Sequence, residues 1–230
     1  MRVIAMAHRA HRAHRTIGRV TQAKSFPRCS QHLLLRIMTI KVLALCGSGR
    51  RDSLNRKLLD ATARGAHEAG GEITFISSAD YRLPLYEGDF EHEHGVPDSV
   101  RHLQRLFAEH TALLVASPEH NGGYTASLKN TIDWISRPLA SGEPGIRLIA
   151  TKVAAVVSAS PGPMGGVRSM LGMRGVLEKL GAIVIPQGFS LGAAHLAFTE
   201  AGRLSDEKAD AEVRLVGARL VETTRQLSRQ

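Results

Sequence analysis

The stretch IKVLALCGSGRRDSLN, residues 40–55, decides how the rest of the chain is read. Its first seven residues form an apolar run that predicts a buried strand, and a Gly, Ser and Arg turn then leads into a helical pattern from Leu54. The first turn of such a helix offers unpaired N–H groups and a partial positive charge, and small residues let a phosphate approach the backbone. The sequence therefore predicts a site for a phosphorylated ligand.

Strand and helix patterns alternate on the C-terminal side of this stretch. Further apolar runs lie at residues 73–76, 112–117, 153–157 and 183–185, with helical spacing between them and a long loop expected at 78–97. The helix near 167–180 is expected to carry an apolar face of Val167, Leu171, Val176, Leu177 and Leu180. Five short strands alternating with helices predict an α/β fold, a doubly wound parallel sheet with helices on both faces.

Ligands of such sheets bind beyond the carboxyl ends of the strands, at the point where the strand order reverses. This rule selects three loops, at residues 47–53, 118–125 and 158–166, and all three are rich in Gly, Ser, Pro or Asn. Small residues of this kind allow a ligand to approach the backbone closely. We therefore expect one site built from three loops.

The first loop favours a terminal monophosphate over other phosphate ligands. It lacks the GxxxxGK[ST] pattern of a Walker loop, and Asp52 occupies the third glycine position of GxGxxG, where a carboxylate would repel a pyrophosphate. Ser48, Arg50, Ser53 and Asn55 supply donors that suit a monophosphate. The alternative is that Ser53 only caps the helix and that Arg50 is a solvated surface charge.

Four segments together resemble the NAD(P)H-dependent FMN reductases, a flavodoxin-like family that includes quinone, azo-dye and chromate reductases. They are GSGRRDSLN (47–55), LPLYEGD (83–89), SPEHNGGYTASLKNTIDW (117–134) and SASPGPMGG (158–166), and the resemblance covers about residues 39–200. Each motif alone is moderately specific, whereas the four in this order are strongly so.

The resemblance implies a residue set for FMN binding. The first loop would hold the FMN phosphate, the second would run along the isoalloxazine, and the third would approach the flavin. The residues are Ser48, Arg50, Ser53, Leu54 and Asn55; Pro118, Glu119, His120, Asn121 and Gly122; and Ser158, Ser160, Gly165 and Gly166. Relatives commonly have Tyr at the position of His120, which puts an aromatic contact there in doubt.

The resemblance also implies the activity. FMN would take hydride from NADPH or NADH and pass electrons to a small acceptor such as a flavin, quinone or azo compound by a ping-pong mechanism. No catalytic side chain is named, because the flavin carries the chemistry, and the family usually forms homodimers or homotetramers. Two alternatives are an FMN-binding electron carrier without NAD(P)H turnover and a dinucleotide-binding dehydrogenase or regulator, which Asp52 disfavours.

Charge separates the first 37 residues from the rest. The chain has a net charge of +9, but residues 1–37 hold seven Arg, one Lys and no acidic residue, which leaves 22 basic and 21 acidic side chains in residues 38–230. A nearly neutral domain argues against nucleic-acid binding. We interpret the basic segment as a disordered extension or as sequence upstream of a true start at Met38; the alternatives are a transit peptide or a polyanion-binding arm.

The remaining patterns favour structural roles. The absence of an apolar run of about 18 residues argues against a membrane span, and two cysteines, Cys29 and Cys46, favour a reduced, cytoplasmic compartment. The run Glu91-His92-Glu93-His94 is expected to be a solvated loop, and no metal site is predicted. Cys46 is expected in the core, and Trp134 is expected in the core or at an interface. Lys129 is expected to pair with Asp133, four residues further along one helix.

Overall fold

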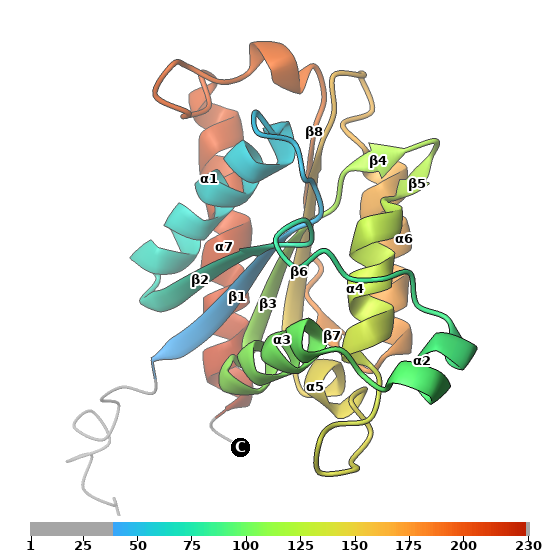
Figure 1. Cartoon of the computed structure of the whole chain (residues 1–230). Helices are drawn as coiled ribbons and strands as arrows, with labels where there is room; N and C mark the ends of the chain where they lie inside the picture. Colours follow the sequence, from blue (N-terminus) through green and yellow to red (C-terminus); the bar gives the residue numbers. More distant parts are fainter. Residues whose placement is uncertain (1–38, 229–230) are drawn as a thin grey trace, which may run out of the picture. The chain divides into compact units, whose positions relative to one another are not determined.

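The computed structural model describes residues 39–228, so the expectations for residues 1–37 and for Cys29 lie outside the described part. It consists of a parallel sheet with helices on both faces (Figure 1). The elements in chain order are β1 (Ile40–Cys46), α1 (Leu54–Glu68), β2 (Gly71–Ser77), α2 (Gly88–His94), α3 (Asp98–Glu109), β3 (Ala112–Ala116), β4 (Glu119–His120), β5 (Gly123–Tyr124), α4 (Ala126–Ile135), α5 (Arg147–Ala150), β6 (Val153–Ala159), α6 (Val167–Lys179), β7 (Ile183–Val184), β8 (Phe189–Leu191), a 3₁₀ turn η1 (Ala194–Leu196) and α7 (Glu207–Leu227).

The main sheet has the order β2-β1-β3-β6-β7, with β8 also paired to β6, and every pairing in it is parallel. The predicted fifth strand at 183–185 is wrong in extent. β7 pairs with the first residues of β6, and β8 pairs with the last residues of β6 at Val157–Ala159, so two short strands share the fifth position. The order is that of flavodoxin-like proteins, and the strand order reverses between β1 and β3.

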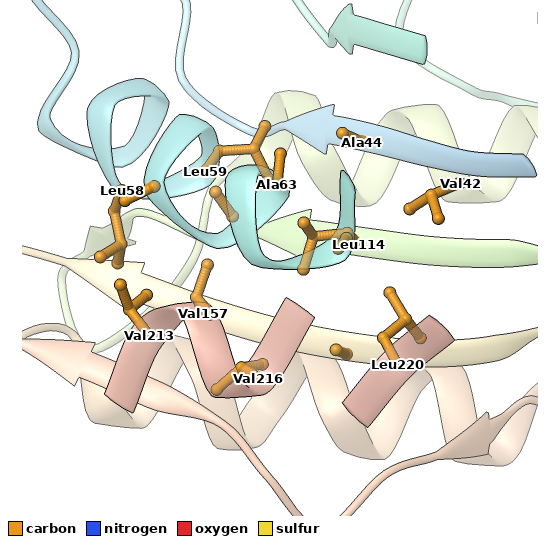
Figure 2. Packing of buried hydrophobic residues seen from close by; sticks show 14 of the residues in the cluster. Val42, Ala44, Leu58, Leu59, Ala63, Leu114, Val157, Val213, Val216 and Leu220 are labelled. Carbon is orange, nitrogen blue, oxygen red and sulfur yellow. The ribbon is translucent and has the colours of Figure 1, made fainter. Parts of the chain in front are cut away.

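Alternate side chains of the central strands enter two separate cores. On one face, Val42, Leu114 and Val157 pack against α1 and α7, as Figure 2 shows. On the other face, Leu43, Leu113 and their neighbours pack against helices that include α3, α4 and α6. Strands buried on both faces read as continuous apolar runs, which explains why they are visible in the sequence.

Two glycines bring α1 and α7 into unusually close contact. A Cβ built on Gly65 would lie 2.0 Å from the backbone oxygen of Arg214, and one on Gly217 would lie 2.0 Å from that of Thr62. Neither position has room for a side chain. This close packing fixes α1, and therefore the loop that precedes it, against α7.

The structure corrects two further expectations. The long loop at 78–97 contains α2, so the run 91–94 is part of a helix, with Glu91 beside Tyr86 and Arg137. Leu171 does not belong to the buried face of α6 but is 58% exposed, whereas Ser169, Met173 and Leu177 are buried. Spacing alone did not separate the inner face of α6 from its outer face, because apolar residues occur on both.

Candidate functional site

The three predicted loops lie at the same edge of the sheet, beyond the carboxyl ends of β1, β3 and β6 (Figure 1). Parallel strands end together, so loops distant in sequence meet there. The order reverses between β1 and β3, and the first and second loops therefore flank the switch point at which flavodoxin-like folds bind their ligand.

The start of α1 has free hydrogen-bond donors. Ser53 is the N-cap, and its hydroxyl accepts from the N–H of Arg56 at 3.2 Å. The N–H groups of Leu54 and Asn55 have no acceptor among the described residues, and the first turn holds no acidic side chain. These donors and the helix dipole suit an anion.

The first loop is tied to the other two by buried hydrogen bonds. The Asn55 amide donates from Nδ2 to the Ala159 carbonyl at 2.8 Å and accepts at Oδ1 from the Ala159 N–H at 3.0 Å. The Thr125 hydroxyl, at the N-cap of α4, donates to the Gly47 carbonyl at 2.9 Å. The loops therefore form one framework rather than three independent segments.

The second loop, predicted only as a loop, contains a hairpin. β4 and β5 pair antiparallel around Asn121 and Gly122, whose φ angles of 52° and 79° are both positive. This is a type I′ turn, and the Asn-Gly pair at 121–122 is its strongest sequence signal. His120, Asn121 and Gly122 are exposed, and the N–H groups of Asn121 and Gly122 have no acceptor among the described residues.

The hairpin is anchored to the start of α6 by Glu119. Its carboxylate accepts from the N–H groups of Arg168 at 3.0 Å and Ser169 at 3.2 Å, and it pairs with the Arg168 side chain at 3.4 Å. A carboxylate at a helix N-terminus satisfies free donors and the dipole. Glu119 therefore fills the α6 N-terminus, in contrast to the open start of α1.

Two buried serine hydroxyls hold the backbone just before the hairpin. Ser158 donates to the Ser117 carbonyl at 2.7 Å, and Ser169 lies 2.8 Å from the Pro118 carbonyl. Gly166, with φ of 81°, lies directly over Ser158, because a Cβ there would be 2.1 Å from the Ser158 hydroxyl. This polar packing fixes the direction in which the hairpin leaves β3.

The third loop is held by the segment after β8. The Ser160 N–H donates to the Leu191 carbonyl at 3.1 Å, and the Ser160 carbonyl accepts from the Ala194 N–H at 3.0 Å. Gly165, with φ of 62°, passes against residues 190–192, where a Cβ would lie 2.7 Å from backbone carbon atoms. No sequence motif marked residues 189–196 as part of the site region.

The fourteen predicted site residues divide into two groups by burial. Eight are at least partly exposed: Ser48, Arg50, Leu54, Glu119, His120, Asn121, Gly122 and Ser160. Six are buried: Ser53, Asn55, Pro118, Ser158, Gly165 and Gly166. The structure brings both groups to one edge of the sheet, with the buried group forming the framework beneath the exposed one.

The other side chains considered in the sequence are buried in the core or take part in ion pairs. Cys46 is a free thiol in the core, and burial raises the pKa of this thiol above its ordinary value. Trp134 is fully buried, and Lys129 pairs with Asp133 at 2.6 Å, as predicted. The Nε atom of Arg137 and the Oε2 atom of Glu91 are 2.8 Å apart, but the N–H does not point at the carboxylate, so the contact is an ion pair without a hydrogen bond.

No group of three or more His, Cys, Asp or Glu side chains is placed to hold a metal ion in the described part of the chain. No helix in residues 39–228 combines the length and apolarity that a membrane crossing requires.

The strand order, with its reversal between β1 and β3, defines the class of this protein as a flavodoxin-like α/β protein. A family model described as NADPH-dependent FMN reductase matches residues 40–196. A NAD(P)H:quinone oxidoreductase of Solanum tuberosum is 38% identical over 183 residues, which cover 77% of this chain and 89% of that protein. A quinone reductase of Pseudomonas putida is 33% identical over 168 residues, which cover 72% and 85% of the two chains.

Solved structures agree with this match. The flavoenzyme FerB, an NAD(P)H:(acceptor) oxidoreductase from Paracoccus denitrificans, superposes with a TM-score of 0.67 and 27% identity, covering 82% of this chain and 98% of that one. The chain belongs to the NADPH-dependent FMN reductase family. It is an NAD(P)H-dependent oxidoreductase of the FMN and quinone reductase type, with FMN as its cofactor.

Proposed function

We propose that the chain passes electrons from NAD(P)H to small acceptors, among them quinones, flavins and azo compounds, by a ping-pong mechanism. One observation carries the location of the cofactor: the start of α1 has free N–H donors at the β1/β3 switch point, whereas Glu119 fills the start of α6. A phosphate therefore meets favourable donors at α1 and a carboxylate at α6.

The residues present fit an FMN phosphate at the first loop. We propose that the N–H groups of Leu54 and Asn55, the Ser48 hydroxyl and the Arg50 guanidinium bind it, because these donors are accessible. Ser53 and Asn55 carry side chains that are 3% and 5% exposed and already bonded to the backbone. We therefore expect these two side chains to shape the site rather than to contact the phosphate.

The hairpin supplies donors for the other end of the cofactor. The free N–H groups of Asn121 and Gly122 suit the polar edge of an isoalloxazine, and Ser160 and the backbone of the third loop would approach from the opposite side. FMN, when bound, supplies the capacity to take two electrons from a nicotinamide and to release them to an acceptor. The chain's own residues bind and orient the ligands, and we propose no catalytic acid or base.

The proposed function includes an oligomeric state and a cellular location. We expect a homodimer or homotetramer in which the exposed Leu171 on α6 lies in an interface, because its side chain is a large apolar group on the surface. The reduced Cys46 thiol is consistent with the expected cytoplasmic location, and a nearly neutral domain supports small-molecule substrates over nucleic acid.

The test uses the purified full chain, titrated with FMN and then with NADPH or NADH under anaerobic conditions. We expect bound yellow flavin that either nucleotide bleaches, and parallel double-reciprocal plots when a benzoquinone is the acceptor. Replacing Arg50 with Ala should weaken FMN binding about 10-fold, since a charge-assisted hydrogen bond contributes about 1.5 kcal/mol or more. The matched control is Arg105→Ala, an exposed arginine on α3 outside the three loops.

Three results would contradict the proposal in different ways. Flavin that binds but is not reduced by either nucleotide indicates an electron carrier. No affinity for FMN rejects both the reductase and the carrier. Equal FMN affinity in Arg50→Ala and Arg105→Ala means that Arg50 is a solvated surface charge.

A further inference from the structure

We propose that a second phosphate site lies beside the first loop, on the β2 side of β1, and that it takes the 2′-phosphate of NADPH. The proposal rests on the proposed function, because it assigns a subsite to that co-substrate. It concerns a cavity that shares Ser48 and Arg50 with the proposed FMN site and adds an arginine, Arg51, that the FMN site does not use.

The cavity has a volume of about 200 Å³ and lies between the loops that follow β1 and β2. Its polar lining consists of the three arginines Arg50, Arg51 and Arg56, the serines Ser48 and Ser77, and Asp80. No residue of the second or third loop lines it. Sites for a whole drug-sized ligand measure roughly 300–1,000 Å³, so this volume suits one group of a ligand that extends outside it.

The charge of the cavity favours an anion. Arg56 is neutralised by Asp60 at 2.9 Å, but neither Arg50 nor Arg51 forms an ion pair with any described carboxylate. Asp80 offsets one of these charges and also accepts from the Ser77 N–H at 3.0 Å. A net positive charge on guanidinium groups, which bind phosphate through two parallel N–H bonds, suits a phosphate monoester.

Hydroxyl groups add to this chemistry. The Ser48 oxygen accepts from the Arg50 N–H at 3.4 Å, and its proton has no acceptor among the described residues. The Ser77 hydroxyl donates to the Ser48 carbonyl at 3.3 Å and so connects the two loops that enclose the cavity. The loop after β1 forms one wall of the cavity and the loop after β2 forms the other.

The cavity adjoins the proposed site of the FMN phosphate and extends from it toward the loop that follows β2. The ligand of this fold lies at the switch point between β1 and β3, whereas the cavity lies on the other side of β1, toward the edge strand β2. FMN has one phosphate, which the proposed function places at the start of α1. The other phosphate monoester in the reaction is the 2′-phosphate of NADPH, which NADH lacks, so the cavity would make the enzyme prefer NADPH.

The first experiment compares Arg51→Gln with Arg105→Gln in the FMN-loaded enzyme. We expect Arg51→Gln to raise the KM for NADPH about 10-fold and to leave the KM for NADH and the Kd for FMN unchanged. The control should change none of the three. Equal changes with NADPH and NADH, or no change with either, overturn the proposal. Weaker FMN binding in Arg51→Gln assigns the cavity to the FMN phosphate and overturns it as well.

The second experiment does not depend on turnover. Calorimetry on the full chain compares adenosine 2′,5′-bisphosphate, which carries the 2′-phosphate, with 5′-AMP, which does not. We expect the wild type to bind the bisphosphate about 10-fold more tightly than it binds 5′-AMP. The Arg51→Gln variant should bind the two nucleotides with equal affinity. Equal affinities in the wild type reject the subsite, even if neither nucleotide reduces the flavin and the proposed function itself fails.

Discussion

Single side chains in this protein join loops that are far apart in the sequence. The Asn55 amide uses both its donor and its acceptor on Ala159, a residue 104 positions away, and so fixes the start of α1 against the end of β6. Buried polar groups are stabilising when they are satisfied in this way and costly when one partner is lost. Asn55, which the sequence suggested as a phosphate ligand, therefore also joins the first loop to the third.

Lys152 is a buried lysine whose charged form is disfavoured by its surroundings. Lys152 directly precedes β6 and is 5% exposed, and among the described residues its side chain donates only to the Thr151 hydroxyl, at 3.4 Å. Burial lowers the pKa of Lys152 to about 8. The folded state then holds fewer protons than the unfolded state between that pH and the ordinary lysine pKa near 10.5.

We therefore expect Lys152→Met to raise the free energy of unfolding at pH 7 by at most about 3 kcal/mol. Since the unfolded state binds more protons, the wild type gains stability as the pH rises from about 8 to 10.5, and the advantage of the variant should disappear over that range. Urea unfolding at pH 7, 9 and 10.5 measures both quantities. A difference between the two proteins that does not depend on pH would show that Lys152 is not buried in its charged form.

At the scale of elements, the close packing of α1 on α7 and the anchoring of the β4–β5 hairpin on α6 position the site. Gly65 and Gly217 allow the first contact, and Glu119 provides the second. The sequence pattern predicted α1, α4 and α7 because each has an apolar face of helical spacing. It missed the hairpin, although the Asn121-Gly122 pair is a strong local signal, and it missed α2, whose residues include none that are buried.

Glu119→Ala should lower the free energy of unfolding by about 1–2 kcal/mol, because it leaves two N–H groups at the start of α6 without their acceptor. Glu119→Gln keeps an oxygen acceptor and loses only the charge, so the expected loss is about 0.3–1 kcal/mol. Urea unfolding of both variants measures the change in the free energy of unfolding. FMN titration measures whether the hairpin still binds the cofactor.

Glu87→Ala is the control for these variants. Glu87 is an exposed glutamate whose side chain makes no cap hydrogen bond at the start of α2. If Glu119→Ala, Glu119→Gln and Glu87→Ala are equally stable, the carboxylate does not anchor the hairpin.

At the scale of the whole molecule, the family match begins at residue 40, where β1 begins. We propose that residues 38–230 form one FMN-binding domain and that the basic residues 1–37 are not part of it. Deleting residues 1–37 should therefore leave kcat/KM with NADPH and the Tm unchanged. Loss of activity or of stability in this variant would show that the basic segment belongs to the functional unit.

A second deletion serves as a matched control. Deleting residues 1–43 also removes Ile40–Leu43, the first half of the interior strand β1, which pairs with both β2 and β3. This variant should not fold, and circular dichroism measures that outcome. A folded and active product would contradict the sheet described above.

The amino-acid sequence by itself determined the fold class, the alternation of the main strands and helices, and the positions of the three loops, whereas the preference for a monophosphate stays a prediction. These features depend on neighbours a few residues apart: apolar runs for strands buried on both faces, helical spacing for the helices, and small residues in the loops. Only the tertiary structure decided the strand order, the division of the fifth strand, the burial of Ser158, and the use of the α6 N-terminus by Glu119. Those features depend on hydrogen bonds and close contacts between residues far apart in the chain, which no local pattern contains.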